Sequence, residues 1–87
     1  MSGERFDWDK MRVFSVVADL GSMSAAATRL GESPPTISRK IDSLEDALGS
    51  ELFVRSTRGV SLTPAGRIAL GHAKTMSDAA DALYTDA

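Results

Sequence analysis

The amino-acid sequence predicts a mainly α-helical fold with three short helices, a two-stranded β-hairpin and a long C-terminal helix. Three observations predict it. Apolar residues recur at helical spacing in several segments. Ser-Pro or Thr-Pro pairs precede two of these segments. One segment between them changes to short β-type runs around a glycine. The 87 residues allow one domain with a modest core.

The first helix is expected over residues 8–20, because Trp8, Met11 and Phe14 follow helical spacing there. We expect Trp8 and Phe14 to be core residues rather than base-stacking platforms. Gly21 ends this helix, since glycine commonly occupies the position just past a C-terminus.

A short second helix is expected over residues 24–30, capped by Ser22 or Ser24. Its alanines are strong helix formers that permit a neighbour to approach closely. Gly31 breaks the chain again.

The third helix is expected over residues 34–48, with Ser33 as its cap and Gly49 as its stop. Proline at the first helical position costs no hydrogen bond. The apolar spacing predicts one core-facing stripe, made of Ile37, Ile41, Leu44 and Leu48.

Two strands are expected over residues 52–55 and 60–62, joined by the four-residue loop 56–59. The glycine at the end of this loop, Gly59, reaches positive φ without steric cost.

The last helix is expected from Pro64 to near Tyr84, because Thr63-Pro64 repeats the start signal. A helix of about 20 residues is about 30 Å long, roughly the width of so small a domain. Part of its apolar face therefore needs a partner, and a symmetric dimer is the common solution. The apolar stripe consists of Ala65, Ala69, Ala73, Met76, Ala80 and Leu83.

Composition argues against several classes of protein. The chain has no cysteine and one histidine, His72, which excludes disulfides and disfavours a metal site. No paired carboxylates or nucleophile motif support an enzyme, and no cofactor is expected. No apolar run is long enough for a membrane span. The N-terminus lacks an apolar signal core, so export is not expected.

The net charge is −2, from 10 basic and 12 acidic residues, but the charge is segregated. Residues 52–77 carry four basic residues and no acid, and Arg39 with Lys40 forms a second basic pair. Segregation of this kind can give an acidic protein one basic face.

The second and third helices, separated by a glycine-containing turn, are typical of a helix-turn-helix that presents the tip of its second helix to the DNA major groove. The positive end of the helix dipole and the free amides there favour a phosphate. A protruding hairpin with Arg55 and Arg58 can reach the DNA backbone or the minor groove. The tip carries Ser33, Pro34, Pro35, Thr36, Ser38, Arg39 and Lys40.

Several of the basic residues have a second interpretation. Arg39 is expected to pair with a guanine edge or a phosphate, and the alternative is an ion pair with Asp42. The stem of Arg55 can instead pack on the hairpin while its guanidinium bonds carbonyls, and the alternative for Arg58 is a solvated loop arginine. For Arg29, exposure to solvent is as consistent with its position as a phosphate contact. A protein-interaction module without nucleic acid is the competing class of function, favoured by the net acidity.

Long ordered motifs shift this balance. Phe14 and the run GSMSAAATRL are followed by S-x-P-x-x-S-x-x-I-x-x-L-E-x-x-L-G from Ser33 to Gly49. The run L-F-x-R-x-x-R-x-x-x-L-T-x-A-G then extends from Leu52 to Gly66. From about Trp8 to about Lys74, the chain resembles the N-terminal domain of LysR-type transcriptional regulators.

The resemblance implies a winged helix-turn-helix domain over residues 1–62 and a linker or dimerisation helix over 63–87. It implies binding to double-stranded promoter DNA as a homodimer, in the cytoplasm at the bacterial nucleoid. In the family a larger effector-sensing domain follows. Nothing in these residues corresponds to it, so a small-molecule effector is expected only through a domain absent from this chain.

Carried over by position, the resemblance implies base contacts by Thr36, Ser38 and Arg39, and a wing arginine at Arg58. Ser33 and Lys40 are expected to contact phosphates, Lys40 as a point charge. Glu45 falls in the family's Leu-Glu pair, where a structural role is expected. Where the family often has glutamine, this chain has Pro34, which offers only apolar contact. Pro35 falls on another of the family's groove-facing positions.

Overall fold

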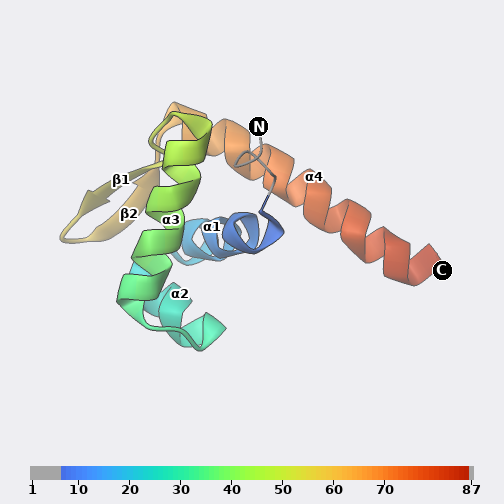
Figure 1. Ribbon diagram of the computed structural model, residues 1–87, viewed down its shortest axis with the longest axis horizontal. Coiled ribbons are helices and arrows are strands. Elements are labelled where there is room, and N and C mark those ends of the chain that lie inside the picture. The colour runs from blue at the N-terminus through green and yellow to red at the C-terminus, as the bar shows by residue number, and fades with distance from the viewer. Residues whose placement is uncertain (1–6, 87) are drawn as a thin grey trace.

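The structure is a computed structural model that describes residues 7–86. Residues 1–6 of the predicted 1–62 domain and residue 87 of the predicted 63–87 linker lie outside the described residues. Within 7–86 the fold is mainly helical with one antiparallel hairpin, as predicted (Figure 1). The elements are α1 (Trp8–Leu20), α2 (Met23–Leu30), α3 (Pro34–Leu48), β1 (Phe53–Ser56), β2 (Gly59–Leu62) and α4 (Pro64–Asp86).

The predicted helix ends are largely confirmed. Gly21, Gly31 and Gly49 each follow a helix in the left-handed region, with φ near 70°. The cap of α2 is Ser22, whose Oγ accepts the N–H of Ala25 at 3.1 Å. The predicted start at residue 24 is therefore wrong by one residue, because α2 begins directly after Ser22.

The turn of the hairpin is shorter than predicted. Ser56 pairs with Gly59, so the turn has two residues, Thr57 and Arg58, and the four-residue loop is wrong. Gly59 has φ of 123° and a Cβ there would overlap the carbonyl of Gly21, so only glycine fits. Leu52 precedes β1 because its N–H donates to the carboxylate of Glu45 instead of to the sheet.

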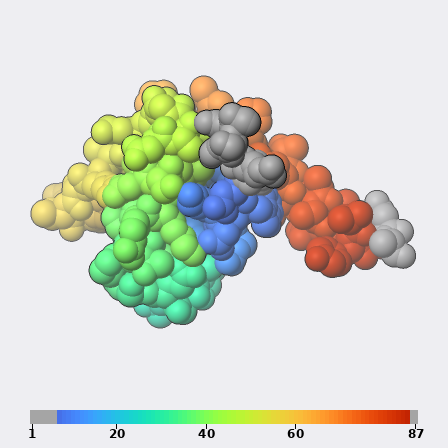
Figure 2. All heavy atoms as spheres, in the orientation of Figure 1, coloured from blue at the N-terminus to red at the C-terminus, as the bar shows by residue number. Residues whose placement is uncertain are grey.

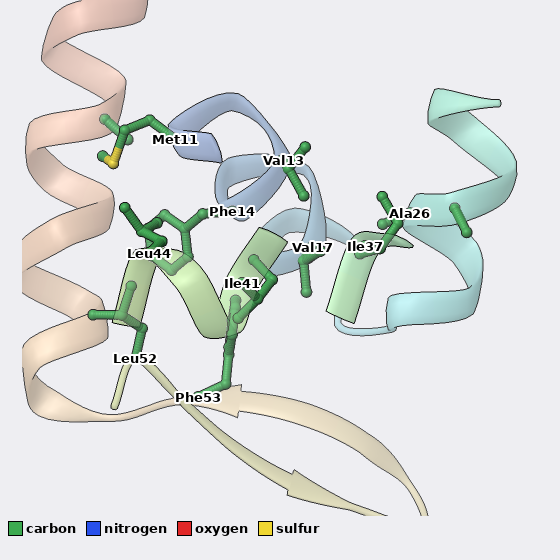
Figure 3. Packing of buried hydrophobic residues seen from close by; sticks show 12 residues of the cluster. Met11, Val13, Phe14, Val17, Ala26, Ile37, Ile41, Leu44, Leu52 and Phe53 are labelled. Carbon is green, nitrogen blue, oxygen red and sulfur yellow. The ribbon is translucent and has the colours of Figure 1, made fainter. Parts of the chain in front are cut away.

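The core lies where α1 packs against α2, α3 and α4. Phe14 is fully buried, as predicted, and its ring centroid lies 5.2 Å from that of Phe53 (Figure 3). Each fully buried large apolar side chain contributes about 1.5–3 kcal/mol to folding. The largest fully buried side chains are Phe14, Ile37, Ile41, Leu52, Val13 and Val17.

Two core predictions are wrong, and both concern helix ends. Leu48 is 52% exposed, because it is the last residue of α3 and lies beyond the buried stripe of Ile37, Ile41 and Leu44. Trp8 is 39% exposed, because it is the first residue of α1, where it borders a groove between α1 and α4 rather than the core.

The helix α4 begins against the hairpin and then leaves the domain. Thr63 Oγ1 accepts the N–H of Gly66 at 2.9 Å and donates to the carbonyl of Glu51 at 2.6 Å. Ala73 is buried against the core, whereas Tyr84 is 84% exposed. Figure 1 shows the distal part of α4 projecting from the body of the domain.

Candidate nucleic-acid interface

The exposed tip of α3 is built from a serine cap and two prolines. The Oγ of Ser33 accepts the N–H of Thr36 at 3.3 Å and lies 2.9 Å from Thr36 Oγ1. Ser33, Pro34 and Pro35 are exposed. The predicted free amides at this tip are wrong, because prolines have no N–H and that of Thr36 is taken by Ser33. The tip therefore presents hydroxyls and apolar rings.

Arg39 lies on the exposed side of the second turn of α3. Among residues 7–86, no carboxylate forms an ion pair with it. The alternative pairing with Asp42 is not formed, and Asp42 Oδ1 is bound instead by Arg55 at 2.7 Å. The guanidinium of Arg39 thus remains available to an external anion or acceptor.

Lys40 is held by two carboxylates. Its Nζ lies 2.7 Å from Asp9 Oδ2 and 3.1 Å from Glu32 Oε1, which links α3 to α1 and to the turn before α3. The hydrogen bond to Asp9, and then that to Glu32, raises the pKa of Lys40 above its usual 10.5. The same hydrogen bond from Lys40 lowers the pKa of Asp9. A phosphate contact by Lys40 stays a prediction.

Arg55 connects the hairpin to α3. Its guanidinium donates to Ser38 Oγ at 3.2 Å and to Asp42 at 2.7 Å, and lies 3.5 Å from Glu45 Oε1. Glu45 in turn accepts the N–H groups of Leu52 and Phe53 at 2.7 and 3.3 Å. The structural role expected for Glu45 is confirmed by these bonds.

Arg58 occupies the exposed hairpin turn, opposite the start of α2. Its backbone N–H donates to Ser56 Oγ at 3.2 Å. Together with Ser22 and Ser24 it borders an open groove of about 360 Å³. Figure 2 shows α3, in green, on the face of the molecule turned to the viewer, with the hairpin, in yellow, beside it. Arg29 is exposed at the last turn of α2.

The cations expected at the interface therefore fall into two groups. Arg39 and Arg58 are exposed, and no carboxylate in the described residues neutralises them. Lys40 and Arg55 are each bound to two carboxylates. Sequence reasoning missed these pairings, because the partners Asp9 and Lys40 are 31 residues apart and nothing in the local pattern joins them.

In residues 7–86, no three His, Cys, Asp or Glu side chains converge to hold a metal ion. Among the helices described, none combines the length and apolarity that crossing a membrane requires. His72 is exposed on α4.

Comparison with known proteins identifies the family. The family described as "Bacterial regulatory helix-turn-helix protein, lysR family" matches residues 8–67. The chain belongs to the LysR family. It is 50% identical over 70 residues to the HTH-type transcriptional regulator BbuR of Bordetella bronchiseptica, covering 80% of this chain and 22% of that protein. It is 47% identical over 72 residues to a probable hydrogen peroxide-inducible genes activator of Mycobacterium avium, covering 83% and 23%.

Solved structures of LysR-type proteins are similar across almost the whole chain. The CbnR_DBD–DNA complex matches with a TM-score of 0.87 and 37% identity, covering 93% of each chain. The BenM_DBD complex with catB site 1 DNA matches with a TM-score of 0.87 and 30% identity, covering 92% and 90%. This LysR-type chain thus has the winged helix-turn-helix fold, with the β1–β2 hairpin as its wing. The chain spans about a fifth of the length of the curated relatives it matches.

Proposed function

We propose that this chain binds double-stranded DNA sequence-specifically and thereby regulates transcription. The observation that carries the proposal is the placement of two exposed arginines. Arg39 is near the tip of α3, and Arg58 is on the wing turn beside the start of α2. An α-helix fits the major groove, and an arginine beside it suits the narrower minor groove. The similarity to two LysR-type domains in complex with DNA supports the same function.

The proposed contacts follow the place of each residue at the tip of α3 or on the wing. Arg39, Ser38 and Thr36 read base edges, and Arg58 enters the minor groove. Ser33 contacts a phosphate through its hydroxyl. Pro34 and Pro35 have no donor at this tip and pack against base edges that carry apolar groups, such as the thymine methyl. Lys40 and Arg55 are each already paired with carboxylates, which compete with a phosphate for the same positive charge.

A second part of the proposal is a homodimer formed through α4, with one half-site per subunit of a partly palindromic element. The apolar residues Ile68 and Leu83 of α4 are exposed, at 66% and 68%. Pairing of two such helices covers apolar surface that the domain leaves open. We further propose that residues 63–87 form this separate linker, that the chain acts as a regulator rather than an enzyme, and that it works where bacterial DNA lies, in the cytoplasm.

The test begins with selection of binding sites from random duplexes, followed by fluorescence anisotropy with the selected duplex. We expect Arg39→Ala to weaken binding roughly 5- to 160-fold, as for about 1–3 kcal/mol, and to relax preference at one base pair. Lys74→Ala is the matched control, since Lys74 is an exposed cation on α4. Affinity that depends on neither sequence nor salt would instead support a protein-interaction module.

A further inference from the structure

Three residues of α3 face the wing from successive turns. Ser38, Asp42 and Glu45 stand at i, i+4 and i+7, and all three lie within reach of the guanidinium of Arg55 on β1. Residues at this spacing share one face of a helix. The side chain of Arg55 on the wing thus contacts two successive turns of α3, on the face next to the proposed DNA contacts.

The positive charge of Arg55 is neutralised by carboxylates of α3. Its guanidinium lies beside two carboxylates, Asp42 at 2.7 Å and Glu45 at 3.5 Å. Their joint formal charge exceeds that of the guanidinium, so the cluster has no excess positive charge with which to attract a phosphate. The side chain of Arg55 is 38% exposed. Arg39 is exposed too, but no carboxylate in the described residues pairs with it.

The hydrogen bond to Ser38 has a defined polarity. Guanidinium N–H groups are donors only, so Ser38 Oγ is the acceptor at 3.2 Å. A hydroxyl has one hydrogen. That hydrogen remains for an external acceptor, since no bond in which Ser38 donates its hydroxyl hydrogen is formed within residues 7–86.

We propose that Arg55 is a positioning residue for DNA recognition, which holds the wing against α3 and fixes Ser38 as a hydrogen-bond donor toward the DNA. This inference rests on the proposed DNA-binding function. A donor at Ser38 selects an acceptor on the base edge, such as guanine O6 or N7, adenine N7 or thymine O4.

The position of Arg58 depends on how β1 is held against α3. Arg58 lies three residues after Arg55, at the hairpin turn. The carboxylate of Glu45 fixes the N–H groups of Leu52 and Phe53, at the start of the same strand. Arg55 and Glu45 thus anchor β1 to α3 at two points, and the position of Arg58 relative to α3 depends on this anchor.

The experiment measures anisotropy of the selected duplex over a range of salt for Arg55→Met, Arg55→Lys, Ser38→Ala and the double variant Ser38→Ala/Arg55→Met. Lys74→Met is the control for loss of one positive charge, and thermal unfolding verifies that each variant is folded. We expect Arg55→Met to weaken binding about 10-fold with the salt slope unchanged, whereas loss of a phosphate contact lowers that slope by about 0.9. Arg55→Lys restores little, because an ammonium cannot reproduce the planar fork.

The double variant tests the link to Ser38. Ser38→Ala is expected to weaken binding about 5-fold in the wild-type background and less than 2-fold beside Arg55→Met, since interacting residues give non-additive effects. Repeated site selection with Arg55→Met is expected to relax preference at the base pair that Ser38→Ala also relaxes.

Other results would overturn the inference. A salt slope lowered by about 0.9 in Arg55→Met, with recovery in Arg55→Lys, makes Arg55 a phosphate contact. Additive effects of Ser38→Ala and Arg55→Met remove the orienting role. If Arg55→Met does not fold, Arg55→Lys decides through affinity and selected site. Failure of the proposed function is distinct, since the wild-type protein then shows no sequence-dependent binding at all.

Discussion

Replacing Glu45 by alanine tests the junction between the wing and the recognition helix. The side chain of Glu45 is 14% exposed. Its Oε2 accepts the N–H of Leu52 at 2.7 Å and that of Phe53 at 3.3 Å, and both of those residues are buried. Alanine removes the acceptor and leaves two backbone donors without this partner.

The magnitude follows from these bonds. A hydrogen bond to a charged group contributes about 1.5–3 kcal/mol. The 2.7 Å bond is expected to contribute within this range, and the longer 3.3 Å bond to contribute at its lower limit or below it. Glu45→Ala is therefore expected to lower the free energy of unfolding by about 3 kcal/mol. Glu45→Gln retains an oxygen acceptor with neutral bonds of roughly half the strength, which gives a loss of about 1.5 kcal/mol.

Urea unfolding followed by circular dichroism measures both losses. The matched control is Asp46→Ala, the adjacent exposed acid of α3, whose replacement is expected to change stability by less than about 0.5 kcal/mol. If Glu45→Ala unfolds with the same free energy as Asp46→Ala, the carboxylate bonds to the start of β1 contribute nothing and the reasoning fails.

Three further predictions concern the close contacts, the wing and the ion pair of Asp9. A Cβ at Gly66 would overlap the carbonyl oxygen of Leu52, so Gly66→Ala is expected to destabilise the fold by at least about 2 kcal/mol in urea unfolding. The control is Gly71→Ala, where a Cβ meets open space, and equal stability of the two variants would contradict the contact. Arg58→Ala is expected to lower the salt slope of DNA binding by about one, and an unchanged slope would remove Arg58 from the DNA contacts. Asp9 has a lowered pKa, so its pairing stabilises the fold above pH 3.8 and this gain is lost as the pH falls through the folded-state value. Lys40 has a raised pKa, so the gain is present below pH 10.5 and lost as the pH rises through its folded-state value. The stability difference between wild type and Asp9→Asn is therefore expected to be constant near neutral pH and to shrink at both extremes, and a difference that stays constant down to pH 2 or so would exclude the pairing.

Helix boundaries and much of the core could be predicted from the sequence, because both depend on interactions between residues close in the chain. Ser33 caps α3 by bonding an amide three residues on, and Gly49 ends it through its own φ. The buried stripe of α3 follows from helical spacing, as Ile37 and Ile41 illustrate. The wing turn was predicted in place but not in length, because the pairing of Ser56 with Gly59 depends on how β1 and β2 meet.

The state of each charged residue at the candidate interface depended on the tertiary structure. The sequence pattern indicates no carboxylate partner for Lys40 or Arg55, and each meets two carboxylates once the chain is folded. Trp8 shows the same limit for an apolar residue, since its exposure depends on where α4 passes. Local spacing determines which face of a helix a residue occupies. What that face meets depends on segments 8 to 31 residues away in the chain, which local patterns do not specify.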